Sequence, residues 1–166
     1  MKILFEEELT DKDRESLFGW SERVFPIEGY QYIWAKPTHR IVAREKGIAV
    51  AHLGFASFTL ETRTKNIKVI GVGSVVVRPE YQGKKIPNTL FSMLHNSDVL
   101  ESKKTVSSLF CPERLTSYYA KHGYSVFAGR VRFLQKGKYV ETNEYSLMLR
   151  GASNFTGIIS IPSEPW

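Results

Sequence analysis

The hydrophobic positions of the chain change their spacing along its length. From residue 41 to residue 77 the apolar residues are mostly β-branched or aromatic, and polar turns at 45–47 and 62–66 interrupt them. This composition and punctuation are typical of strands. The pattern therefore predicts an antiparallel meander of three strands over residues 41–44, 48–60 and 67–77.

The first forty residues predict a short strand followed by a helix. Residues 2–7 fit the strand, and Thr10 with Asp13 three positions later resembles a capping box. Apolar residues then recur at helical spacing at Leu17, Phe18, Val24 and Phe25. We expect a helix from Thr10 to about residue 25, and a structured loop over residues 26–38, where proline and glycine stand among aromatics.

After residue 77 the pattern alternates between strands and helices. A basic loop at 78–85 precedes a helix from Pro87 to about His95, and a strand at 105–110 precedes a second helix at 112–122, which Gly123 ends. Strands at 126–134 and 145–150 are expected to form a final hairpin, followed by an extended piece at 156–161. These elements predict an α+β fold with a mixed sheet, and 166 residues suit a single domain over 1–166.

Composition narrows the class of protein. Hydrophobic residues make up 42% and charged residues 24%, which excludes wholesale disorder. The 23 Lys and Arg outnumber the 17 Asp and Glu, so the net charge of +6 favours an anionic partner. Cys111 is the only cysteine, and the four histidines lack metal-ligand spacing, so we expect no disulfide and no metal. The acidic N-terminus and the lack of a long apolar run predict a cytoplasmic protein that does not enter a membrane.

The loop at 78–85 has the composition of a phosphate site. It follows a strand, contains Gly83 and enters a helix, whose N-terminus presents unpaired N–H groups and partial positive charge. Lys84 and Lys85 add full charges at the same place. A plain strand–loop–helix joint with solvated lysines is the alternative.

The residues of this loop carry a family resemblance. Val75-Val76-Val77-Arg78-Pro79-Glu80-Tyr81-Gln82-Gly83-Lys84 resembles the core motif of the GCN5-related N-acetyltransferase (GNAT) superfamily. The resemblance implies a mostly antiparallel, twisted sheet flanked by helices, and it implies acetyl-coenzyme A as co-substrate. It assigns the pantetheine arm to the backbone of Val75 and Val77, and the pyrophosphate to a loop of Gln82, Gly83, Lys84, Lys85, Ile86, Pro87 and Asn88.

Two positions of this loop depart from the family pattern. Lys85 stands where the family has glycine, and Pro87 stands where it has glycine or alanine. Lys85 would replace close backbone approach with a side-chain charge. Pro87 suits the first turn of a helix but removes one N–H donor.

A second motif supports the same family. Tyr119-Ala120-Lys121-His122-Gly123-Tyr124 fits the tyrosine, three free positions, glycine and aromatic residue that the superfamily commonly shows. The resemblance implies that Tyr119 faces the coenzyme sulfur, where its hydroxyl would protonate the leaving thiolate. The backbone N–H near Val77 is the matching candidate to polarise the thioester carbonyl. The alternative is that Tyr119 only packs in the core.

Two shorter segments resemble narrower groups. Residues 47–54 are similar to a strand of the nodulation N-acyltransferases, and Glu164-Pro165-Trp166 is similar to the tail of the aminoglycoside 2′-N-acetyltransferases. The latter resemblance implies that Glu164 and the carboxylate of Trp166 contact the substrate amine, with Glu28 as a further acid from the loop. The alternative is a frayed tail with an incidental tryptophan.

These motifs predict an N-acetyltransferase that moves an acetyl group from acetyl-coenzyme A to a primary amine by direct attack in a ternary complex. The expected acceptor is a small amino sugar or aminoglycoside-like amine, although Lys36 and Arg40 make residues 26–40 a poor match for a polycation. Members of the superfamily are often dimers, so the resemblance allows a homodimer. The alternatives are a longer acyl donor, or an inactive module that binds coenzyme A or nucleic acid.

Overall fold

The structure is a computed structural model that describes residues 1–97, 105–151 and 155–166. Its strands are β1 (Lys2–Glu6), β2 (His39–Glu45), β3 (Ile48–Glu61), β4 (Asn66–Val77), β5 (Val106–Cys111), β6 (Ser125–Val126), β7 (Arg130–Gln135), β8 (Lys138–Glu141), β9 (Ser146–Arg150) and β10 (Ile158–Ile161). Its α-helices are α1 (Asp11–Phe18), α2 (Ile86–His95) and α3 (Thr116–Ala120), and its 3-10 helices are η1 (Ile27–Gln31), η2 (Pro79–Tyr81) and η3 (Glu113–Leu115).

All of these strands belong to one sheet. The order β6-β9-β5-β4-β3-β10-β7-β8 runs across it, and β2 and β1 continue from the first part of β3. The pairs β4–β5 and β7–β10 are parallel and the others are antiparallel. The predicted α+β fold with a mixed, mostly antiparallel sheet is confirmed, including the meander of β2, β3 and β4.

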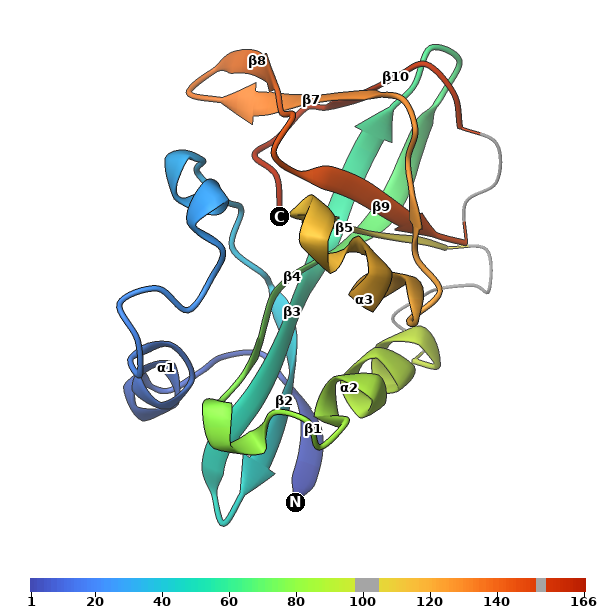
Figure 1. Ribbon diagram of the computed structural model, residues 1–166. Helices are drawn as coiled ribbons and strands as arrows, with labels where there is room; N and C mark the ends of the chain where they lie inside the picture. Colours follow the sequence, from blue (N-terminus) through green and yellow to red (C-terminus); the bar gives the residue numbers. More distant parts are fainter. Residues whose placement is uncertain (98–104, 152–154) are drawn as a thin grey trace.

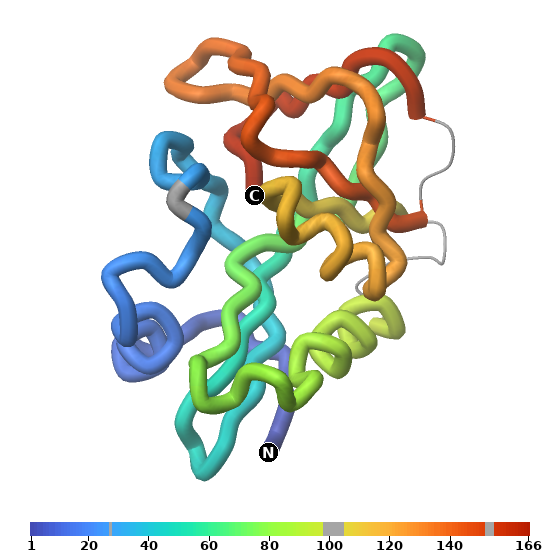
Figure 2. The backbone as a smooth tube through the Cα atoms, in the orientation of Figure 1, coloured from blue at the N-terminus to red at the C-terminus, as the bar shows by residue number. Residues whose placement is uncertain are grey.

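Helices α1 and α2 cover opposite faces of the long strands (Figure 1), and the backbone tube of Figure 2 shows the same arrangement. Successive residues of a strand point to opposite faces, and β2 shows the consequence. Val42 packs with Leu17 of α1, whereas Ile41 and Ala43 belong to the cluster that contains Leu90 of α2. The end of β4 shows the same alternation, because Val76 belongs to the cluster of α1 while Val75 and Val77 pack against the cluster of α2.

The capping box of α1 is confirmed, but the helix is shorter than predicted. The Thr10 side chain accepts a hydrogen bond from the Asp13 backbone, and the Asp13 side chain accepts one from the Thr10 backbone. The helix ends at Phe18, where Gly19 is the C-cap and the Trp20 indole donates to the Leu17 carbonyl at 2.8 Å.

The prediction of a helix face through residue 25 was therefore wrong. The Trp20 indole N–H occupies the Leu17 carbonyl, which would otherwise accept a backbone N–H from the next turn of a longer helix. Val24 and Phe25 instead line a cavity described below.

Two predictions for the C-terminal third were also wrong. The helix expected over residues 112–122 is divided into η3 and α3, and α3 ends at Ala120, before a turn in which Gly123 has φ +85°. The expected hairpin of residues 126–134 with 145–150 does not form, because β7 pairs with β8 across the turn Lys136-Gly137 while β9 pairs with β5 and β6. Both turn residues have positive φ, as in a tight hairpin.

Candidate active site

A β-bulge lies in the middle of β4. Val76 is opposite His52 and Gly73 is opposite Gly54, so Ser74 and Val75 together face one residue of β3. Ser74 adopts φ +51°, which a side chain rarely permits. Such a bulge bends its strand and re-aims the residues around it.

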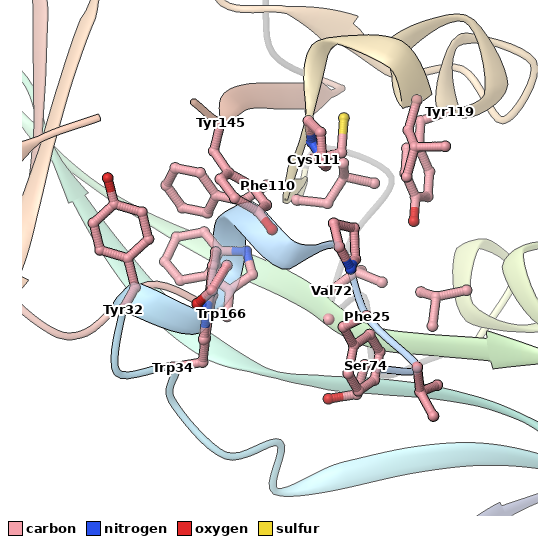
Figure 3. A pocket seen from close by; sticks show the side chains of 18 of the residues that line it. Phe25, Tyr32, Trp34, Val72, Ser74, Phe110, Cys111, Tyr119, Tyr145 and Trp166 are labelled. Carbon is pink, nitrogen blue, oxygen red and sulfur yellow. Dashed lines mark hydrogen bonds between the residues drawn. The ribbon is translucent and has the colours of Figure 1, made fainter. Parts of the chain in front are cut away.

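Strands β4 and β5 separate at this bulge and leave a cavity of about 770 Å³ between them. Their parallel pairing ends at Val72 and Leu109, although each strand continues further. Ligand sites of small molecules commonly have volumes of roughly 300–1,000 Å³. Figure 3 shows the cavity, which is lined by Val72–Val75 of β4, Leu109–Cys111 of β5 and parts of the 24–35 segment, η3, α3 and the chain end.

Tyr119 lines this cavity. Its ring packs edge-to-face on Phe91 of α2, with 6.0 Å between the ring centroids. Burial raises the pKa of the Tyr119 hydroxyl, so the group stays protonated at neutral pH. The side chain therefore packs against the core and also presents a hydroxyl donor to the cavity.

Cys111 reaches the same cavity but is a poor nucleophile. Burial raises the pKa of its thiol to about 11, and its Sγ lies 3.5 Å from Sδ of Met148. The thiolate is the reactive form of cysteine, so this environment favours a small apolar role for Cys111.

Trp166 forms a fixed wall of the cavity. It is 5% exposed, it stacks on Phe58 with 4.2 Å between centroids, and its indole N–H donates to the Ser108 carbonyl at 3.2 Å. A Cβ at Gly71 would collide with the indole ring, so this position requires glycine. The interpretation of the tail as frayed is wrong, because the Pro165 carbonyl also accepts a hydrogen bond of 2.7 Å from the Ala35 backbone.

The two predicted acidic side chains lie in different places. Glu164 is half-buried and is not among the residues that line the cavity. Glu28 of η1 is not a lining residue either, but it binds Arg114 of η3, which does line the cavity, with N···O distances of 2.6 and 3.4 Å. A hydrogen bond from its own backbone and the Arg114 guanidinium lower the pKa of Glu28, so this carboxylate is a weak base.

The predicted phosphate loop follows β4 directly. Gly83 and Lys85 both have positive φ, and Lys85 is the N-cap of α2 without a side-chain cap. Among the described backbone hydrogen bonds, none is donated by the amides of Gly83, Lys84 or Ile86. The loop therefore offers free N–H groups together with two lysines at a helix N-terminus, which is a favourable arrangement for phosphate.

Two side chains of this loop already have partners. Lys84 places its ammonium 4.5 Å from the centroid of the Tyr81 ring. The Gln82 amide donates to the Val77 carbonyl at 3.2 Å, which ties the loop back to the end of β4.

The structure thus brings together Val75, Tyr119 and Trp166 around one cavity. Val77 is the last residue of β4, beyond the part that lines the cavity. The loop from Gln82 to Asn88 follows it and leads into α2. Sequence reasoning missed the aromatic residues Trp34, Phe110 and Tyr145 that complete the cavity; the only signal was the number of aromatics in the loop at 26–38.

Within residues 1–97, 105–151 and 155–166, no three His, Cys, Asp or Glu side chains are placed to hold a metal ion. No helix in these ranges has the length and apolar character to span a membrane.

Known proteins share this architecture. The fold is similar to ElaA of Escherichia coli (15% identity, 90% of this chain and 99% of that one, TM-score 0.57) and to an acyl-CoA N-acyltransferase of Pseudomonas aeruginosa (17%, 90% and 98%, 0.57). It is also similar to YhbS of E. coli, a GNAT family N-acetyltransferase solved in complex with CoA (15%, 96% and 89%, 0.56). No curated protein matches the chain. The model of the acetyltransferase (GNAT) domain matches residues 7–127, so the chain belongs to this family and is a GNAT-type acetyltransferase.

Proposed function

We propose that the protein transfers an acetyl group from acetyl-coenzyme A to a primary amine of a small molecule. The observation that carries this proposal is the cavity at the separation of β4 and β5, with the Tyr119 hydroxyl in it and the amide-rich loop at the end of the same strand. In this arrangement the pyrophosphate lies on the loop from Gln82 to Asn88. The pantetheine arm follows β4 past Val77 and Val75, and the thioester reaches the cavity.

The chemistry requires one proton to leave the amine and one to reach the sulfur. The neutral amine attacks the thioester carbonyl, the new C–N bond forms, and the C–S bond breaks with its electron pair going to sulfur. Tyr119 donates its proton to that thiolate and recovers one from the nitrogen of the product through water. The net reaction converts an ammonium and a thioester into an amide, a thiol and one released proton.

The volume and the lining of the cavity bear on the acceptor amine. An amino sugar or aminoglycoside-like amine is the acceptor suggested by the sequence, and a small amine fits the cavity volume. No Asp or Glu side chain is among the described residues that line the cavity. A polycationic aminoglycoside is therefore the weaker candidate, because buried charges need partners.

The test measures both the binding of acetyl-coenzyme A and the acetylation of amines. Acetyl-coenzyme A should raise the melting temperature in a saturable manner, and thiol release should appear with at least one amine of a varied panel. Stabilisation without thiol release for any amine would favour an inactive coenzyme-binding module. Absence of both, with nucleic-acid binding that weakens steeply with salt, would overturn the proposal.

A further inference from the structure

The half of the cavity opposite Tyr119 is an aromatic wall. Figure 3 shows Tyr32, Trp34, Phe110, Tyr145 and Trp166 gathered on one side, with Tyr119 on the other. The rings contact each other with centroid distances of 5.1 Å for Trp34–Tyr145, 6.2 Å for Trp34–Phe110 and 5.5 Å for Phe110–Trp166. Tilted and edge-to-face contacts of this kind hold each ring in place, so the wall is a rigid surface.

Most polar atoms of this wall are used within the protein. The Trp34 indole donates to the Gly29 carbonyl at 2.7 Å, the Trp166 indole donates to Ser108, and the Tyr32 hydroxyl binds Thr142 at 3.1 Å. The wall therefore offers mainly carbon faces to a ligand.

Tyr145 is the exception. Among the described residues its hydroxyl has no hydrogen-bond partner, and it lies against Gly29, where a Cβ would be 2.6 Å from the oxygen. Burial raises the pKa of this hydroxyl to about 12. It is one polar contact in an otherwise apolar half-cavity.

The side-chain charges around the wall are balanced before any ligand enters. Arg114 is the one Lys, Arg, Asp or Glu among the described residues that line the cavity, and Glu28 neutralises it at 2.6 Å. Several ammonium groups would each need a buried partner, and the side chains of this lining supply no carboxylate. Desolvation also lowers the pKa of a bound ammonium, so a single amine becomes the neutral nucleophile on entry without a strong base.

From these observations we infer that the acceptor is a primary amine with a single positive charge on a flat apolar body, such as an arylalkylamine. This inference rests on the proposed function and names the substrate class of the same site. The ring of the acceptor lies on the aromatic wall, and the amine points across the cavity toward the thioester.

The experiment compares acceptors that differ in one property. Thiol release from acetyl-coenzyme A is measured with 2-phenylethylamine, with benzylamine and its doubly charged analogue p-xylylenediamine, and with glucosamine and kanamycin. The expected result is a kcat/KM at least tenfold higher for the singly charged aryl amines than for the other three. In parallel, quenching of tryptophan fluorescence in the protein loaded with coenzyme A reports binding of each amine without turnover.

A matched pair of variants ties the preference to the wall. Tyr145→Leu should raise the KM for 2-phenylethylamine at least tenfold and leave the KM for acetyl-coenzyme A unchanged. Tyr139→Leu, at an exposed tyrosine of β8 outside the cavity, should change neither.

The outcomes separate the two proposals. If coenzyme A binds and some amine is acetylated, but the aryl amines show no advantage in turnover or in binding, the inference about the acceptor is wrong and the proposed function stands. If acetyl-coenzyme A neither stabilises the protein nor releases thiol with any amine, the proposed function is wrong. Where coenzyme A binds, tighter saturable binding of the aryl amines than of glucosamine and kanamycin in the fluorescence measurement supports the acceptor class, and equal or weaker binding contradicts it.

Discussion

The ring nitrogen Nδ1 of His52 lies 2.7 Å from the carbonyl oxygen of Ser74, the residue at the β-bulge of β4. Because a carbonyl can only accept, Nδ1 carries the proton, and Nε2 is buried without a partner among the described residues. His52 is thus a core histidine that holds the bulge from the neighbouring strand, and it does not line the cavity.

Replacement of His52 should loosen this bulge. His52→Phe removes the donor to Ser74 and should reduce the unfolding free energy by about 1–3 kcal/mol. It should also lower turnover, because the bulge sets where β4 leaves β5. Urea unfolding and thiol release measure the two effects. His39→Phe, at an exposed histidine of β2, is the control and should change neither by a comparable amount.

The same histidine gives stability a pH dependence. Burial, with a smaller contribution from Arg40, lowers the pKa of His52 to about 4, against 6.5 in the unfolded chain. Between these values the unfolded state binds the proton and the folded state does not, so stability falls as pH decreases from 6.5 toward 4. Between pH 7.5 and 5 the unfolding free energy of the wild type should fall by about 2 kcal/mol more than that of His52→Phe. Parallel pH profiles would contradict the assignment.

The Tyr119 hydroxyl should matter for chemistry and little for binding. Tyr119→Phe keeps the ring against Phe91 but removes the proton donor, so kcat should fall by about 100-fold while the Kd of acetyl-coenzyme A is unchanged. Single-turnover kinetics and calorimetry separate these quantities. Tyr118→Phe on the same helix should retain activity, because Tyr118 does not line the cavity. Unchanged kcat in Tyr119→Phe would leave Tyr119 with a packing role alone.

Lys85 combines charge with a left-handed backbone, and two substitutions separate these contributions. Lys85→Ala removes the charge and should weaken acetyl-coenzyme A binding by about 1 kcal/mol, roughly fivefold in Kd. Lys85→Gly removes the same charge but adopts φ +57° without strain, so it should be more stable than Lys85→Ala by about 1 kcal/mol and bind better.

A second lysine with the same geometry supplies the control for the loop. Lys46 has φ +49° in the turn between β2 and β3, away from the predicted phosphate loop. Lys46→Gly should gain stability without any change in coenzyme affinity. Equal affinities for Lys85→Ala and Lys85→Gly would show that only the charge of Lys85 matters.

The elements that sequence could predict are those with a local cause. Thr10 caps α1, and Gly123 takes the left-handed conformation in the turn after α3, because each acts within a few residues of the chain. The contacts that complete the site are distant in sequence. Glu28 and Arg114 are 86 positions apart, and Trp166 packs on Gly71 because that residue has no side chain to collide with the indole. The spacing of apolar residues along the chain does not show which distant residues meet in the fold.

The prediction of the final hairpin was wrong because strand pairing also depends on contacts between residues that are distant in sequence. The turn Lys136-Gly137 joins β7 to β8, but Lys-Gly is a weaker turn signal than Asn-Gly or Asp-Gly. Residues 147–149 are all buried because a core cluster covers each face of β9, with Met148 in one cluster and Leu147 and Leu149 in the other. The apolar run of a strand buried on both faces does not show which strands lie beside it.

Arg44 joins the first strand to the first helix and provides the last prediction. Its guanidinium binds Glu6 at 2.7 Å and Asp13 at 2.6 Å, and the hydrogen bond from Arg44 lowers the pKa of Asp13 far below 3.8. Because the folded pKa is depressed, this contribution to stability is present above pH 4 and is lost as the pH falls further.

Asp13→Asn should therefore destabilise the protein at neutral pH and destabilise it less in acid. At pH 7 the loss in unfolding free energy should be about 1.5–3 kcal/mol, the value of a hydrogen bond to a charged group. At pH 3 the wild type has lost part of the same interaction. The unfolding free energies of the two proteins, measured in urea, should therefore differ by less than at pH 7. Asp11→Asn, at an exposed acid of the same helical turn, should cost well under 1 kcal/mol at either pH. A difference between wild type and Asp13→Asn that stays constant from pH 7 to pH 3 would show that the carboxylate charge is not the source of the stability.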